Sequence, residues 1–92
     1  MVTTKDIRFI VINKQEDLPT ELEMKGRLHG ATQLEEFIMP NGDIIVACED
    51  IKLNAPDMPV NLKATDMYRQ QTTGFGEAIH GHCYLIKKNV KY

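Results

Sequence analysis

The sequence predicts a mainly β or α+β fold, built as a small barrel or a twisted antiparallel sheet with one or two short helical turns. Two runs rich in β-branched and aromatic residues, 7–12 and 44–48, are typical of strands. The dipeptide Asn41-Gly42 between apolar segments is a strong hairpin signal. With 92 residues, 42% of them hydrophobic, the chain is expected to form one domain over residues 1–92.

The first half of the chain is expected to contribute most of the strands. Residues 7–12 form the first strand, and residues 13–20 a loop that contains Pro19. Residues 21–29 alternate apolar and polar side chains, a period of two that predicts a half-exposed strand. The hairpin around Asn41-Gly42 is then expected to pair Met39 with Ile44 and Phe37 with Val46 through a type I′ turn.

A helix is the alternative for the first arm of that hairpin. Thr32 would cap it, with Glu35 three residues later, and Pro40 would end it. Leu34 and Phe37 also fit one helical face. The sequence leaves strand and helix open for residues 32–39.

The second half has two irregular stretches and one long apolar segment. Pro56 and Pro59 bracket a surface loop, and residues 60–63 form a short strand. Residues 65–71 fit one or two helical turns capped by Thr65 or Asp66. Residues 74–88 are expected to form a long final strand.

The composition excludes several classes of activity. The chain contains no serine, so it has no serine nucleophile. No apolar run reaches the ~20 residues of a membrane span, so no membrane partner is expected. The first residues lack the apolar core of a signal peptide, and two cysteines are too few for a disulfide framework; we therefore expect reduced thiols and a cytoplasmic protein.

The most unusual segment is His80-Gly81-His82-Cys83-Tyr84. On a regular strand, His80, His82 and Tyr84 share one face, while Cys83 points to the other with Ile79 and Leu85. Two histidines two residues apart can ligate one metal ion. The third ligand would be a residue such as His29, Glu77 or Asp66, which the sequence does not place. The alternative is a strand face whose histidines bind neighbouring groups, and no cofactor is then expected.

Neither cysteine is expected to act as a nucleophile. Cys83 faces away from His82 on a regular strand, and Cys48 ends an apolar strand where a small buried thiol is ordinary.

The leading hypothesis is a non-enzymatic protein that binds another protein through an acidic, β-rich surface. An inhibitor or regulator encoded by a phage or mobile element belongs to this class. Pairing at a sheet edge, with a partner or as a homodimer, is the expected mode. The candidate contact residues lie on the proline loop, after the strand 44–48 and on the histidine face: Asp57, Met58, Glu49, Asp50, His80, His82 and Tyr84.

Two other classes remain as alternatives. The first is a small barrel that binds nucleic acid, with Tyr84 or Phe75 stacking on bases. Its cationic residues would be Lys25, Arg27, Arg69, Lys87, Lys88 and Lys91. Because all 13 acidic residues precede the lysine-rich end, the body of the chain is acidic, which disfavours this class. The second is a metal protein or enzyme centred on His80 and His82.

Overall fold

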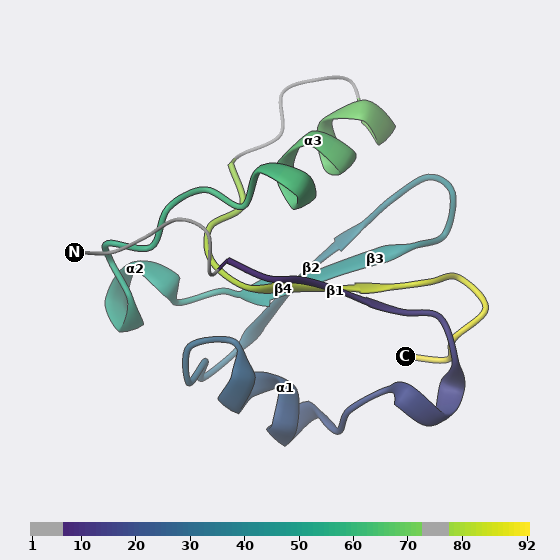
Figure 1. The fold of residues 1–92 in the computed structure, drawn as a ribbon, viewed down its shortest axis with the longest axis horizontal. Helices are drawn as coiled ribbons and strands as arrows, with labels where there is room; N and C mark the ends of the chain where they lie inside the picture. Colours follow the sequence, from purple (N-terminus) through teal and green to yellow (C-terminus); the bar gives the residue numbers. More distant parts are fainter. Residues whose placement is uncertain (1–6, 73–77) are drawn as a thin grey trace.

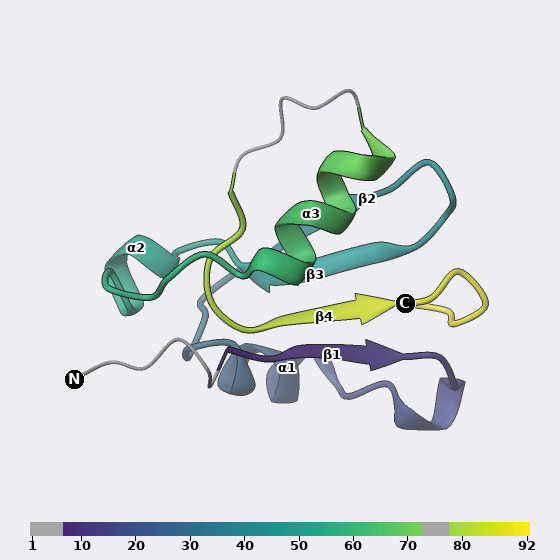
Figure 2. The ribbon, with the colours of Figure 1, turned by 45° about the horizontal axis from the view of Figure 1, so that its top comes forward.

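The structure is a computed structural model that describes residues 7–72 and 78–92. A four-stranded sheet has the order β1 (Phe9–Ile12), β4 (Cys83–Ile86), β3 (Ile44–Cys48), β2 (Leu34–Ile38). β1 runs parallel to β4, whereas β3 is antiparallel to both β4 and β2. The α+β class is confirmed, with a mixed and open sheet that leaves β1 and β2 at its edges (Figure 2).

Helices cover both faces of the sheet. α1 (Glu21–Arg27) lies on one face and α3 (Leu62–Gln71) on the other (Figure 1). The short helix α2 (Ile51–Asn54) follows β3, and a 3-10 turn, η2 (Gln15–Asp17), follows β1. Within the described ranges, no helix is long and apolar enough to cross a membrane.

The apolar core is therefore divided in two by the sheet. The cluster on the α1 face includes Met24, Leu28, Val46, Tyr84 and Ile86. The cluster on the α3 face includes Ile45, Ala47, Ala64, Ile79, Cys83 and Leu85. Because β4 is central and covered on both sides, all four of its residues are buried. The expected grouping of Ile79, Cys83 and Leu85 on one face is confirmed.

The prediction of a strand over residues 21–29 is wrong, because residues 21–27 of this segment form α1. A capping box starts the helix: the Glu23 N–H donates to the Thr20 hydroxyl, and the Thr20 N–H donates to the Glu23 carboxylate. Met24 and Leu28, one helical turn apart, are buried, whereas Leu22 is 80% exposed. Local capping and the burial of this i, i+4 pair therefore outweigh the period of two.

The hairpin is present, and residues 34–38 are a strand, but its register differs by one residue. Ile38 pairs with Ile44, and the Met39 N–H donates to the Asp43 carbonyl. In the expected two-residue turn, Pro40 would have to supply that N–H, which proline lacks. Instead the Gly42 N–H donates to the Met39 carbonyl, and Gly42 has φ 95°, as in a three-residue loop with a glycine bulge.

The second half is more helical than expected. α3 begins at Leu62, and its cap is Asn61, whose side chain accepts the Ala64 N–H; the cap is neither Thr65 nor Asp66. The short strand over 60–63 is reduced to a single bridge between Val60 and His80. The long final strand is confirmed only for residues 83–86, and residues 74–77 lie outside the described ranges.

Candidate functional site

Gly81 breaks the expected row of histidines. Its φ of 78° turns the chain out of strand geometry between His80 and His82. The His80 Nδ1 lies 3.0 Å from the Met58 carbonyl, so this nitrogen carries the proton and donates. His80 is thereby tied to the proline loop.

His82 instead stacks on His29, which follows α1. Their ring centroids are 4.6 Å apart and their planes differ by 8°. The His29 Nε2 accepts the His82 N–H, and the His82 Nδ1 accepts the Arg8 N–H, each at 3.0 Å. Desolvation, and then the neighbouring His82, lower the pKa of His29. The pair therefore works as neutral rings that join α1, β4 and the chain before β1.

The metal hypothesis gains no third ligand from this arrangement. Among the residues that the structure describes, no group of three or more His, Cys, Asp or Glu side chains is placed to hold a metal ion. Of the three candidate third ligands, His29 accepts a hydrogen bond through Nε2, Asp66 is exposed on α3, and Glu77 lies outside the described ranges.

Asn61 anchors the same end of the sheet. It is 3% exposed, and its amide donates to the carbonyls of Arg8 at 3.0 Å and Gly81 at 2.9 Å while its oxygen caps α3. The Gly81 N–H donates to the Pro59 carbonyl. These polar groups connect four segments, so their role is to hold the fold.

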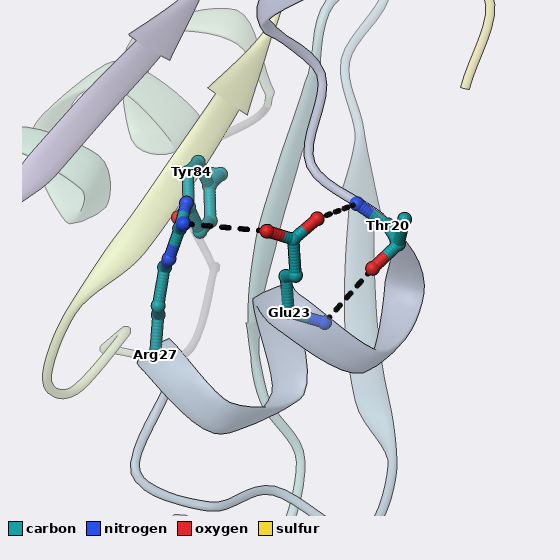
Figure 3. Close-up of polar contacts among 4 residues, drawn as sticks. All are labelled: Thr20, Glu23, Arg27 and Tyr84. Atoms are coloured by element: carbon teal, nitrogen blue, oxygen red, sulfur yellow. Dashed lines mark hydrogen bonds and ion pairs between the residues drawn. The ribbon is translucent and has the colours of Figure 1, made fainter.

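Tyr84 lies in the core and is not on an open surface. It is 1% exposed, and its hydroxyl accepts a hydrogen bond from the Arg27 guanidinium at 3.3 Å (Figure 3). Arg27 also pairs with Glu23 of the capping box, at 3.5 Å. The expected contact face of His80, His82 and Tyr84 therefore does not form as one surface.

The cationic residues proposed for nucleic acid are dispersed. Lys25 and Arg27 belong to α1, and Arg69 to α3 on the opposite face of the sheet (Figure 1). Lys25 pairs with Glu21, and Lys87 pairs with the buried Asp43 at 2.8 Å. Lys88 and Lys91 are exposed near the C-terminal end of the described chain. The fold thus does not gather these cations on one face.

Both cysteines are buried free thiols. Burial raises the pKa of Cys48 to about 11 and that of Cys83 to about 12. Thiols with such pKa values stay protonated at neutral pH, as expected for residues that pack in the core.

The free edge of β2 has a defined set of outward backbone groups. The Glu49 N–H donates to the Gln33 carbonyl, and the Met39 N–H donates to the Asp43 carbonyl. Because hydrogen-bonded pairs alternate along an antiparallel ladder, residues 33, 35, 37 and 39 bond to β3. The N–H and C=O groups of Leu34, Glu36 and Ile38 therefore point away from the sheet.

An open pocket of about 980 Å³ adjoins this edge. It lies between the α3 face of β2 and β3, the helix α2 and the segment before β4. Its apolar lining includes Phe37, Ala47, Ile51, Leu53 and Ile79, and Phe37 is also in edge contact with Tyr68 of α3. The polar lining consists of Thr32, Gln33, Glu35, Glu49, Asp50, Lys52 and His80.

Acidic groups outnumber basic ones around this pocket, with Glu35, Glu49 and Asp50 against Lys52. Asp50 accepts hydrogen bonds from the Thr32 N–H and the Cys48 thiol. Desolvation opposes ionisation of Asp50, but these hydrogen bonds lower its pKa below the usual value. The pocket is negatively charged at neutral pH.

The structure thus brings together Glu49, Asp50 and His80 of the residues expected to contact a partner. It places His82 on the His29 stack and Tyr84 in the core, away from the pocket lining. Asp57 is exposed on the proline loop, and Met58 is half-buried there. Sequence reasoning missed Glu35, Phe37 and Leu53, which the strand register and the position of α2 bring to the pocket.

Comparisons with protein-family models, with curated proteins and with solved structures gave no match.

Proposed function

We propose that the chain is a protein-binding module that adds an extended segment of a partner protein to the free edge of β2. The observation that carries the proposal is the coincidence of this edge with the adjoining pocket. Added strands gain affinity from backbone hydrogen bonds and specificity from pockets that receive alternate side chains.

Three backbone positions on β2 support this mode. The N–H and C=O groups of Leu34, Glu36 and Ile38 face outward and match the spacing of a new strand. Ile38 is 69% exposed, so an added strand also gains apolar contact on the α1 face.

The other edge of the sheet offers less. The backbone N–H and C=O groups of Phe9 and Val11 in β1 point away from the sheet. The carbonyls of Arg8 and Ile12, on either side, accept hydrogen bonds from the N–H groups of Cys83 and Lys87. Val11 is 50% exposed, but the pocket lining includes no residue of β1. An edge without a pocket provides backbone bonds without selection of side chains.

A proline scan of the two edges tests the proposal. Glu36→Pro removes an outward N–H and leaves the β2–β3 ladder intact, and Val11→Pro does the same at the β1 edge. Glu36→Ala controls for the Glu36 side chain, which hydrogen-bonds Tyr92. Random twelve-residue peptides displayed on phage are selected on the wild-type chain, and the affinities of the selected peptides are measured for each variant.

We expect Glu36→Pro to weaken binding at least tenfold, and Glu36→Ala and Val11→Pro to change it less than threefold. Selected peptides that tolerate Glu36→Pro would overturn the proposal. Sedimentation of the wild-type chain provides the second check. A dimer that Glu36→Pro dissociates would show that the edge is occupied by a second copy, and the proposal of a separate partner would be wrong.

A further inference from the structure

We infer that the partner segment carries a lysine or arginine side chain that enters the pocket beside β2. This inference rests on the proposed addition of a strand, and it names the chemistry of the segment. A long cationic side chain requires an apolar wall for its stem and acceptors for its charged end. The pocket contains both.

The apolar wall is formed by side chains from three parts of the fold. Phe37 is half-buried on β2, Ala47 is buried on β3, and Leu53 of α2 is 84% exposed. Phe37 and Ala47 lie on the α3 face of the sheet, where the pocket opens. A methylene stem that covers these side chains removes apolar surface from water, and an aromatic ring also attracts a cation.

The acceptors are carboxylates on the same face of the sheet. Glu35 pairs with Ala47, and the Glu49 N–H bonds to the Gln33 carbonyl, so Glu35 on β2 and Glu49, directly after β3, are diagonal neighbours. Asp50 already accepts hydrogen bonds from Thr32 and Cys48. Glu49 is exposed, so its carboxylate can turn toward an incoming cation.

The register also fixes which residues of the segment enter the pocket. A residue of an added strand directly opposite Glu35 has its side chain on the α3 face, and its two neighbours lie on the α1 face. On the α1 face one neighbour lies opposite Leu34 and the other opposite Glu36, and the exposed Ile38 lies two residues beyond Glu36. The expected segment therefore has a basic residue at the pocket position and an apolar residue beside it, opposite Leu34.

The sequences and affinities of the selected peptides test this inference. We expect lysine or arginine to be enriched at one position near the centre, where the side chain lies on the pocket face. A synthetic copy with citrulline in place of arginine keeps the shape and loses the charge; it should bind about tenfold more weakly. Glu35→Gln and Glu49→Gln should each weaken the arginine peptide about fivefold and leave the citrulline peptide unchanged. Glu16→Gln, an exposed change of the same kind outside the pocket, is the control.

The two proposals fail in different ways. Peptides that lose binding with Glu36→Pro but lack basic residues, or ignore Glu35→Gln and Glu49→Gln, would overturn the basic side chain and leave strand addition standing. Peptides that ignore Glu36→Pro would overturn strand addition. The melting temperature of every variant, within a few degrees of wild type, shows that the fold is retained.

Discussion

The start of β4 and the edge of β2 are both rich in polar groups, but these groups have different partners. Near β4, the side chains of Asn61, His29 and His82 bond to backbone groups of other segments. Along β2, the outward backbone groups face away from the sheet, and Glu49 lies exposed beside the pocket. The first region uses its hydrogen-bonding groups to hold the fold, whereas the second has outward backbone groups, to which we propose that a partner segment binds.

This difference changes the role expected for the histidines, which the sequence suggested as contacts for a partner or a metal ion. His80 and His82 are the most conspicuous polar pair in the sequence, yet they serve as tethers. Substitutions near β4 should therefore reduce stability strongly, and substitutions beside β2 should change binding while stability stays nearly constant.

The largest loss of stability is expected for Asn61→Ala. The change removes the α3 cap, worth about 1 kcal/mol. It also leaves the carbonyls of Arg8 and Gly81 without their donor, at a cost of about 1 kcal/mol for each carbonyl. Urea unfolding should show a loss of about 3 kcal/mol. Asn54→Ala, an exposed asparagine that donates to the His29 and Gly30 carbonyls, should cost less than half as much. Equal losses would contradict the anchoring role of Asn61.

Gly81→Ala is expected to follow, with a loss of about 2–3 kcal/mol. A Cβ at this position would lie 2.5 Å from the His29 Nε2, on a backbone with φ 78°. Gly30→Ala is the matched control, because its φ is 63° but nothing lies within 4 Å of the added atom. Gly30→Ala should lose only the stability that a Cβ costs at positive φ, about 1 kcal/mol.

A double-mutant cycle separates out the part of the Gly81→Ala destabilisation that comes from the clash with His29. In a His29→Ala background, Gly81→Ala should cost at least about 0.5 kcal/mol less than in the wild-type chain. Strict additivity of the two substitutions would mean that His29 does not fill the space beside Gly81.

Acid should weaken the same region. The pKa of His29 is lowered in the folded state, so below about pH 6.5 the unfolded chain binds more protons than the folded chain does. This contribution to stability is complete above the unfolded pKa and decreases as the pH falls toward the folded pKa. The change should be smaller than that caused by Gly81→Ala.

Unfolding free energies measured from pH 8 to pH 5 test this dependence, and His29→Ala should flatten it. Protonation of His29 would remove the acceptor for the His82 N–H and place a charge beside the stacked ring. A histidine titration by NMR that gives His29 an ordinary pKa would remove the basis for this expectation.

The sequence predicted local structure better than long-range contacts. The strand at 44–48, the hairpin and the α+β class followed from β-branched runs and turn chemistry. The capping box at Thr20 and Glu23 was readable as well, but the alternation over 21–29 concealed it. The contact between His29 and His82, 53 residues apart, leaves no local pattern in a single sequence.

The pocket could not be predicted from the sequence because its lining depends on the register between β2 and β3. A shift of one residue moves a side chain to the opposite face of a sheet relative to its partner strand. With the expected pairing, Phe37 would share a face with Val46 in the α1 cluster. The observed pairing with Ile45 puts Phe37 and Glu35 on the α3 face, beside Glu49. Proline at position 40 determines this choice through its missing N–H.

The smallest effect on stability is expected for Glu49→Gln, within about 0.5 kcal/mol of wild type. Glu49 is exposed, and the amide keeps the size of the side chain while removing its charge. Asp43→Asn makes the same chemical change at a 3% exposed carboxylate that accepts from Lys87 and the Lys88 N–H, and it should cost about 2 kcal/mol. Measured side by side by urea unfolding, the two variants compare an acid that holds the fold with one that is free to bind. If Glu49→Gln destabilised the chain by more than about 1 kcal/mol, the Glu49 carboxylate would belong to the network that holds the fold. The difference between the two regions would then not hold for Glu49, whose carboxylate the proposed pocket contact requires.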